Sequence, residues 1–375
     1  MSAADSPADS DELPQVAKAL PRDDPTRTTK LRKRFGSQIY KRYKALKGAV
    51  RQYVLAENRF GIQNAAVADA VANRAIALGS AMDSPHARGR ASNDGDAPVF
   101  YAPNAQIPGM PDPSKVPAIT PPASPSWDFP EDSKKVQAFT EWFRGAQNAI
   151  LLGGGGAGPS AGVGWANEYV RYAYFRGLDF AQDALQSQGF VGEDIDVMDT
   201  FNMPVHQSAL GLIYQRQYSG LKGITDEVDK RVSRILAEGF AAGENPRTIA
   251  RTINDRVDKI GITRGRTLAR TEIVRTYNEA TLNRFEQVVG GDASVQLYAE
   301  FSTARDSRVC PICAALEGTT FRIKDAHNVI PQHPNCRCAW VPVKTNTSAA
   351  ASTRNRRIAL NHQKHSHNVT NAPVA

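Results

Sequence analysis

All four cysteines of this 375-residue chain lie between positions 310 and 338, in "CPIC" and "HPNCRC". The spacings Cys-x-x-Cys and His-x-x-Cys each bring two soft ligands to one tight turn, and two such turns supply the tetrahedral set that zinc prefers. We therefore predict a structural zinc site with Cys310, Cys313 and His333 as ligands and Cys336 or Cys338 as the fourth. An all-cysteine site is the other option.

Two other chemistries compete for these thiols. A disulfide between Cys336 and Cys338 would close a very small, strained ring, whereas a longer-range disulfide such as Cys310 to Cys336 stays open. A catalytic thiol needs a nearby base, and His333 or His327 is close in sequence. A nucleophile does not need three further cysteines, so the metal interpretation is favoured.

The composition indicates a soluble chain of two or three domains, with 41% hydrophobic residues and a mean hydropathy of −0.42. The acidic N-terminal residues contain no apolar signal segment, and clustered thiols indicate synthesis in a reducing cytosol. Residues 146–167 are uncharged, but their glycines and proline make a poor membrane-spanning helix. We expect no membrane association.

The net charge of +8 is concentrated in three runs. Residues 22–51 hold eleven Lys or Arg and two Asp, and residues 246–275 hold eight basic and three acidic residues. The tail from residue 344 to 375 holds five basic residues, three histidines and no acid. Such runs suit phosphate backbones or acidic protein surfaces, although any single run can be a solvated helix face. Since no base-reading motif is present, any DNA binding should be non-specific.

A long amphipathic helix is predicted from residue 31 to 54, where apolar residues recur every three or four positions. No later segment is an obvious intramolecular partner for this stripe, so we predict that the helix docks on another protein or on DNA. The apolar residues proposed for docking are Phe35, Ile39 and Tyr43. The basic residues proposed for it are Arg32, Lys33, Arg34, Lys41 and Arg42.

Further helices are predicted at 136–150, 165–185, 221–243, 246–257 and 263–289, and the period then changes to strands at 295–302, 319–323 and 339–343. The fold class is therefore α+β: a mostly helical N-terminal half, and a C-terminal module of long helices with a small sheet stapled by the Cys/His site. The predicted organisation is a disordered acidic leader (1–29), a basic docking segment (30–79, with a second helix at 62–79), a Pro-rich linker (80–130), a helical region with a Gly-rich loop (131–204), the C-terminal module (205–345) and a disordered basic tail (346–375).

The order of "ARTEIVRTYNEA", a strand, "ARDSRVCPICAALEGTTF" and "HPNCRC" resembles the Mu F-like minor head proteins of tailed bacteriophages, also called head morphogenesis proteins. The resemblance covers residues 205–345 and extends more weakly upstream. By match, the Cys/His set corresponds to the family's Cys/His signature. The other signature residues, expected to be structural, are Arg270, Thr271, Glu272, Asp306 and Arg308.

The resemblance implies a virion component made in the host cytoplasm. It implies a place inside the capsid close to the portal, with portal and capsid or scaffold proteins as partners and non-specific double-stranded DNA as a further contact. The first alternative is a zinc module that itself binds DNA through Arg322, Lys324 and Arg337 during packaging or ejection.

The second alternative is an enzyme with a zinc or thiol centre. The chain contains no P-loop, no G-x-S-x-G and no H-E-x-x-H motif. Glu272 and Arg275, three residues apart on one predicted helix, are expected to form an ordinary surface pair. Five candidate ligands favour a closed structural zinc over a catalytic one, which needs an open position. We therefore expect no enzymatic activity.

Overall fold

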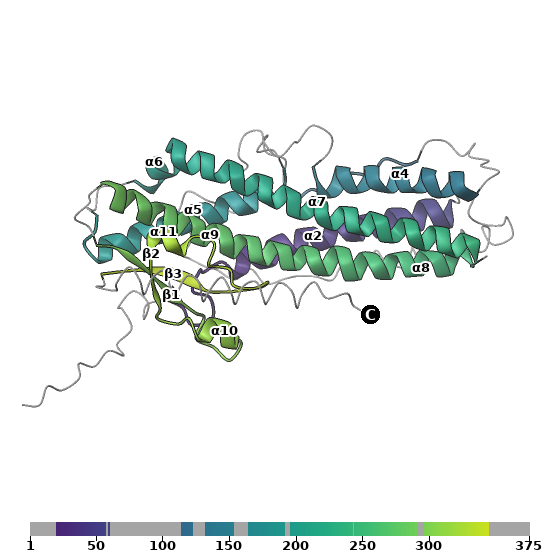
Figure 1. The fold of residues 1–375 in the computed structure, drawn as a ribbon. Coiled ribbons are helices and arrows are strands. Elements are labelled where there is room, and N and C mark those ends of the chain that lie inside the picture. The colour runs from purple at the N-terminus through teal and green to yellow at the C-terminus, as the bar shows by residue number, and fades with distance from the viewer. Residues whose placement is uncertain are drawn as a thin grey trace, which may run out of the picture. The chain divides into compact units, whose positions relative to one another are not determined.

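The computed structural model describes residues 20–57, 59–60, 114–122, 132–153, 164–191, 196–242, 244–291 and 296–344. Most of the predicted leader, the predicted helix at 62–79, most of the linker and the whole tail at 346–375 lie outside the described residues. Helices and strands keep the labels of Figure 1. No helix among the described residues is long and apolar enough to span a membrane.

The chain divides into two compact units. The first, which we name the sheet unit, comprises Met1–Phe35, Tyr169–Ile213 and Thr267–Ala375. The second, the helical unit, comprises Gly36–Glu168 and Tyr214–Arg266. Each unit combines segments from several parts of the sequence, so neither corresponds to one of the predicted consecutive domains.

The helices are long and account for most of the described residues. They are α2 (Thr29–Val50), η1 (Arg51–Ala56), α4 (Asp132–Leu151), α5 (Asn167–Ser187), α6 (Val197–Asn202), α7 (Pro204–Ala241), α8 (Pro246–Arg256), η2 (Val257–Ile262) and α9 (Thr263–Gly291). Two short helices follow in the C-terminal part, α10 (Pro311–Ala314) and α11 (Ile323–Ala326). The helices predicted within the described residues are confirmed, whereas α6, α10 and α11 were not predicted. Two further differences concern helix ends. Helix α7 begins at Pro204 rather than near residue 221, and π-helix η2 joins α8 directly to α9.

The sheet contains three antiparallel strands, β1 (Tyr298–Ser302), β2 (Thr320–Arg322) and β3 (Ala339–Val343), in the order β2-β1-β3 (Figure 1). Phe301 of β1, Phe321 of β2 and Trp340 of β3 are fully buried, and their rings meet edge to face. This aromatic cluster belongs to one core with Cys313, Cys336 and residues of α5 and α9. The α+β fold class predicted from the sequence is confirmed.

Helices α5 and α9 approach each other closely at Gly177. A Cβ atom placed there would lie 2.2 Å from the backbone oxygen of Tyr277 and 2.9 Å from the Cβ of Ala280. Thr281 donates a hydrogen bond from its hydroxyl to the Gly177 carbonyl at 3.2 Å, at the same contact. A glycine at this position therefore sets the distance between the two helices that carry the sheet.

We expect Gly177→Ala to lower the free energy of unfolding by about 1–3 kcal/mol, because the added methyl group overlaps a backbone atom that cannot rotate away. Gly223→Ala is the matched control, since Gly223 is a helical glycine and an added methyl group would meet no atom within 4 Å there. The free energy of unfolding of that control should rise by about 0.4–1 kcal/mol. Urea unfolding followed by circular dichroism measures both. Equal effects of the two substitutions would contradict the packing argument.

The apolar stripe of α2 is buried within the chain, so the prediction that it lacks an intramolecular partner is wrong. Phe35 and Ile39 are fully buried and Tyr43 is 1% exposed. In the helical unit, a Cβ at Gly261 would lie 2.4 Å from the Tyr43 ring, and a Cβ at Gly265 would lie 2.7 Å from Ile39. In the sheet unit, the Phe35 ring stacks on Tyr169 at 4.8 Å. These side chains are part of the two cores and are not available for docking.

Arg42 of α2 is also buried, at 1% exposure. It donates to the carbonyl oxygens of Ile150 at 2.9 Å and Lys115 at 3.0 Å, and its guanidinium lies 4.0 Å above the Trp165 ring. Carbonyls at the C-terminal end of α4 and the face of an aromatic ring both stabilise a cation. The described residues of the predicted linker, 114–122, therefore contact α2 within the helical unit.

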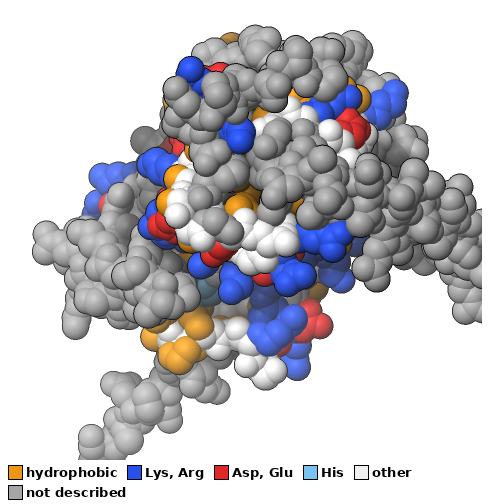
Figure 2. Space-filling view, turned by 90° about the vertical axis from the view of Figure 1, so that its right-hand side faces the viewer, with side chains coloured by type: hydrophobic (Ala, Val, Ile, Leu, Met, Phe, Trp, Pro, Cys, Tyr) orange, Lys and Arg blue, Asp and Glu red, His pale blue; other side chains and the backbone are white. Residues whose placement is uncertain are grey.

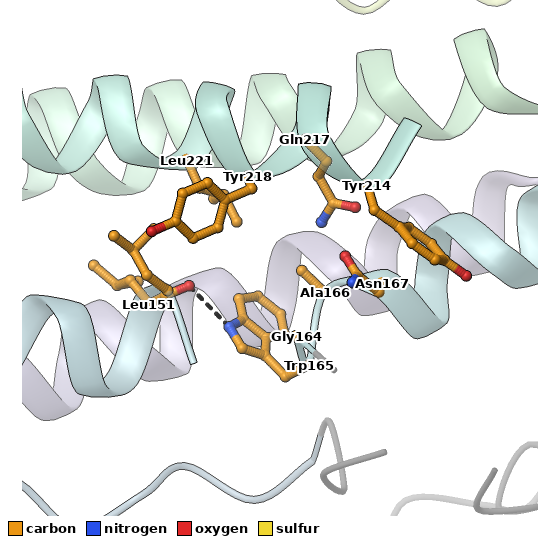
Figure 3. Close-up of a pocket in the computed structure, with 10 residues that line it drawn as sticks. Leu151, Gly164, Trp165, Ala166, Asn167, Tyr214, Gln217, Tyr218 and Leu221 are labelled. Carbon is orange, nitrogen blue, oxygen red and sulfur yellow. Dashed lines mark hydrogen bonds between the residues drawn. The ribbon is translucent and has the colours of Figure 1, made fainter. Parts of the chain in front are cut away.

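A small, partly open cavity lies between α7 and the segment where α4 ends and α5 begins (Figure 3). Trp165 donates to the Leu151 carbonyl at 3.0 Å beside this cavity. Gln217 of α7 also lines it, is 1% exposed, and has no hydrogen-bond partner for either amide atom among the described residues. The cavity volume of about 20 Å³ is enough for one water molecule, which would satisfy part of this amide.

Candidate metal centre

The Cys/His cluster is built by two loops at the ends of the sheet strands. Cys310 ends the loop that follows β1 and caps α10, since its sulfur accepts from the backbone N–H of Cys313 at 3.4 Å. Pro311 occupies the first turn of this helix, where its missing N–H costs nothing. "HPNCRC" leads directly into β3. The strands thus hold both halves of the predicted site close together.

Two groups of ligand atoms share Cys313. The atoms of Cys310, Cys313 and His333 lie within 4.8 Å of one another, and so do those of Cys313, Cys336 and Cys338. All four cysteines are free thiols. The five residues predicted as ligands are therefore brought together, although the Cys310–Cys336 disulfide considered from the sequence is not formed.

The spacing within the cluster fits a tetrahedral zinc. Bond lengths of about 2.3 Å to sulfur and about 2.05 Å to nitrogen place tetrahedral ligands about 3.8 Å (S···S) and about 3.6 Å (S···N) apart. The Cys313 sulfur lies 4.0 Å from the Cys336 sulfur and 3.4 Å from Nε2 of His333. Thiolate and imidazole donors at these distances can hold a metal ion.

The ring of His333 is oriented for metal binding. Its Nδ1 atom lies 2.8 Å from the Pro334 carbonyl oxygen, which can only accept a hydrogen bond, so Nδ1 carries the proton. The lone pair of the neutral ring is then on Nε2, the atom that faces Cys313. A hydrogen bond of this kind fixes the tautomer of a metal-binding histidine.

The pKa values of the buried thiols are shifted in opposite directions. Hydrogen bonds from Cys313 and Cys338 lower the pKa of the Cys336 thiol, since they stabilise its thiolate. The pKa of the Cys313 thiol is raised, first by its hydrogen bond to Cys336. A thiolate at the centre of a cluster of sulfurs is the form that binds a metal. His327, the other base considered from the sequence, instead lies 3.0 Å from Glu286.

Two residues of α9 hold the turn formed by residues 333–338 in place. The Thr271 hydroxyl accepts from the backbone N–H of Asn335 at 3.0 Å, in a turn where Asn335 has a positive φ of 64°. Asn278 donates to the Cys338 carbonyl at 3.0 Å and accepts from the Trp340 N–H at 2.9 Å. Thr271 thus contacts the turn that carries Cys336, while its role as a signature residue stays a prediction, and Asn278 is a supporting residue that sequence reasoning missed.

Ion pairs and hydrogen bonds join the loops that carry the cysteines to the first described residues of the chain. Arg337 makes two hydrogen bonds to the Asp306 carboxylate, at 2.7 and 2.6 Å, and donates to the Asp23 carbonyl at 2.9 Å. Arg308 also donates to Asp306, and these donors hold the pKa of that carboxyl well below its usual range, Arg337 first. Arg305 donates to the Leu20 carbonyl at 3.1 Å. Residues 20–24, which we name the strap, are therefore attached to the loops that carry the cysteines.

The basic residues predicted to bind DNA or a partner occupy different environments. Arg32 is 7% exposed and pairs with Asp24 of the strap at 2.8 Å, so it is not available, as found above for Arg42. Lys33, Arg34 and Lys41 are exposed, and their assignment to binding stays a prediction. Arg337 is engaged by Asp306, which argues against its use as a DNA contact in the alternative zinc module.

The remaining signature residues differ in burial. Arg270 is exposed, whereas Glu272 is 5% exposed. Glu272 lies 3.5 Å from Arg275 on the same helix. The expectation that this is an ordinary surface pair is wrong, because no residue of α9 between positions 271 and 285 is exposed.

The comparison with protein families bears on the same region. Residues 230–341 match the family model described as "Phage Mu protein F like protein". These residues, which we name the Mu F-like segment, are similar to that family. The segment includes all five candidate ligands, the supporting residues of α9, strands β1 and β2 and the first residues of β3. Neither a search of curated proteins nor a search of solved structures gave a match. The predicted resemblance is confirmed, and it supports a role in phage head morphogenesis.

The Mu F-like segment also buries a carboxyl group in the central strand. Glu300 of β1 is 6% exposed and its Oε1 has no hydrogen-bond partner among the described residues. Burial, and then the nearby Glu317, raise the pKa of this carboxyl to about 7, while Arg305 acts in the opposite direction. The folded protein therefore binds this proton more tightly than the unfolded chain does.

We expect Glu300→Gln to stabilise the protein by about 1–3 kcal/mol at pH 8 and to have little effect at pH 4.5. The pKa is higher in the folded state, so the native carboxyl lowers stability as pH rises from about 4.5 to about 7. Urea unfolding of the wild type and the variant at several pH values measures the difference. A stability difference that does not change with pH would contradict the prediction.

Proposed function

We propose that this protein is a structural component of a phage head. It is carried inside the capsid close to the portal, and it contacts portal and capsid or scaffold proteins during assembly. The observation that carries the proposal is the match of residues 230–341 to the Mu protein F-like family. Long helices suit a binding role, since their surfaces are large enough to contact other proteins.

We propose that zinc is the metal of the Cys/His cluster and that it is structural. Three or four sulfurs with at most one imidazole form a soft donor set, which favours zinc over magnesium or calcium. Four or five candidate ligands leave no coordination position for a substrate, so the role is to hold loops whose strands are only three to five residues long. On this proposal the protein is not an enzyme.

The test of the head function uses full-length protein during head assembly. Heads assembled with the portal should retain the protein after external protease treatment and gradient purification, as measured by quantitative mass spectrometry. Heads assembled without the portal should contain much less of it. Absence from purified heads would contradict the head function. Equal amounts with and without the portal would contradict the portal attachment alone.

A second candidate function is non-specific contact with packaged double-stranded DNA. It is favoured by the exposed cations of α2, which include Lys33, Arg34 and Lys41. Such binding depends on phosphate charges, so its affinity should fall steeply with salt concentration.

A further inference from the structure

An open groove of about 280 Å³ lies within the helical unit, between α2 and the segment where η2 continues into α9. Six residues line it: Tyr40, Lys44, Lys47, Asp258, Ile262 and Thr263. It lies outside the Cys/His cluster, and the resemblance assigns nothing to it.

The two walls of the groove are held at a fixed separation by glycines. Gly261 and Gly265 face α2, and a Cβ at either position would lie within 2.7 Å of Tyr43 or Ile39. Because these contacts are made by backbone and fully packed side chains, the walls cannot shift without disrupting the core. The side chains at the rim therefore project from a rigid base.

The groove is strongly basic. Apart from the buried Arg42, residues 40–51 and 258–266 contain seven basic residues and one acidic residue. The acidic residue, Asp258, is held by Lys47 at 2.5 Å. In the part of the chain that the structure describes, Lys44 and Lys259 make no ion pair with an acidic side chain. Figure 2 displays one face of the molecule, on which Lys and Arg side chains (blue) are more prominent than Asp and Glu (red).

An arginine is pre-oriented at the rim. The guanidinium of Arg266 lies 4.9 Å above the ring of Tyr40, which is itself 40% exposed. Stacking on an aromatic ring restricts the guanidinium while its N–H donors stay at the ring's edge, so less entropy is lost when they bind an anion. Planar guanidinium donors match the two oxygens of a phosphate.

We propose that this groove binds the phosphodiester backbone of a nucleic acid. Lys44 and Lys47 line the groove, and the exposed Lys41 precedes Lys44 by one turn of α2 outside the lining. The three lysines are spaced by three residues, about 4.5 Å along a helix, and one DNA strand carries a charge about every 3.4 Å along its axis. The groove lacks the cluster of large apolar anchors that centres a protein interface. Its lining also contains no Asn, Gln or Arg positioned to read a base edge, so binding is independent of sequence.

The proposal deepens the DNA contact of the proposed function and rests on it. The experiment measures fluorescence anisotropy of full-length protein with two 30-bp duplexes of unrelated sequence and with a 30-nucleotide single strand, at several salt concentrations. The Lys41→Gln/Lys44→Gln variant should bind at least tenfold more weakly at low salt, with a salt slope smaller by about two. The control, Lys222→Gln/Lys230→Gln on the exposed face of α7, should change affinity less than threefold.

Comparing the affinities for the duplexes and for the single strand identifies which nucleic acid is bound. Tighter binding of either one supports the proposal. Equal loss in the two variants would show that only net charge matters and would overturn the groove assignment. Affinity that does not vary with salt would also overturn it, as would stronger competition by polyglutamate than by DNA. Since the groove variant alters no residue of the Mu F-like segment, its normal incorporation into heads would leave the head function standing.

Discussion

Cys313→Ser is expected to abolish binding of about one zinc ion per chain and to lower the stability of the sheet unit by several kcal/mol. Cys313 is the residue that both groups of ligand atoms share, so either choice of four ligands loses a sulfur. Metal affinity is part of the folding free energy of such a site, because the unfolded chain does not hold the ligands together. Loss of metal is therefore expected in Cys313→Ser whichever outer residue completes the site.

Metal content is measured by elemental analysis of protein purified without chelator, and stability by thermal unfolding with and without EDTA. Cys310→Ser and Cys338→Ser are the informative comparisons, because each alters only one of the two groups. If Cys310 is the spare ligand, its variant keeps the metal and Cys338→Ser loses it; the opposite result identifies Cys338. Equal zinc in the wild type and in Cys313→Ser, or none in the wild type, would contradict the metal centre.

The spacing of the cysteines was enough to predict this site, because ligands within three residues are positioned by local turns. The residues that hold the two turns together were harder to find. Thr271 and Asn335 are 64 residues apart, and Arg337 contacts Asp23 across 314 residues. Hydrogen bonds of this range leave no periodic pattern in a single sequence, so they become visible only when the chain is folded.

Periodicity likewise identified most helices and all three strands, since burial of one face imposes a repeat on the sequence. It did not identify the start of α7, where residues 204–220 mix exposed apolar and buried polar side chains. Val205 and Leu212 are exposed there, whereas His206 and Gln217 are buried. A hydrophobic pattern of this kind does not reveal which side of a helix faces the core.

The partner of the α2 stripe was missed for a different reason. Its contacts are made in part by Gly261 and Gly265, which have no side chain and contribute nothing to a hydrophobic pattern. The stripe was therefore predicted to dock on another protein, whereas the structure places it in the core. The same helix carries both buried apolar residues that pack against the segment containing these glycines and lysines that line the groove beside it.

This arrangement predicts a large effect of the double substitution Ile39→Ala/Tyr43→Ala. Both side chains are at most 1% exposed, and both meet glycines whose missing side chains leave nothing to fill the space created. We expect the free energy of unfolding to fall by at least about 4 kcal/mol. Each large-to-small change in a core costs about 2–5 kcal/mol, and the effects of neighbouring sites are not strictly additive. Urea unfolding of the full chain measures it, and a loss below about 1 kcal/mol would show that the stripe is not core.

The matched control is the groove variant Lys41→Gln/Lys44→Gln, which alters two exposed residues on the same turns of α2. It should unfold within about 0.5 kcal/mol of the wild type, because surface substitutions away from packed features have small effects. The two double variants are thus expected to separate stability from nucleic-acid binding on one helix. If the groove variant unfolded as readily as the core variant, its weaker DNA binding would reflect loss of structure rather than loss of charge.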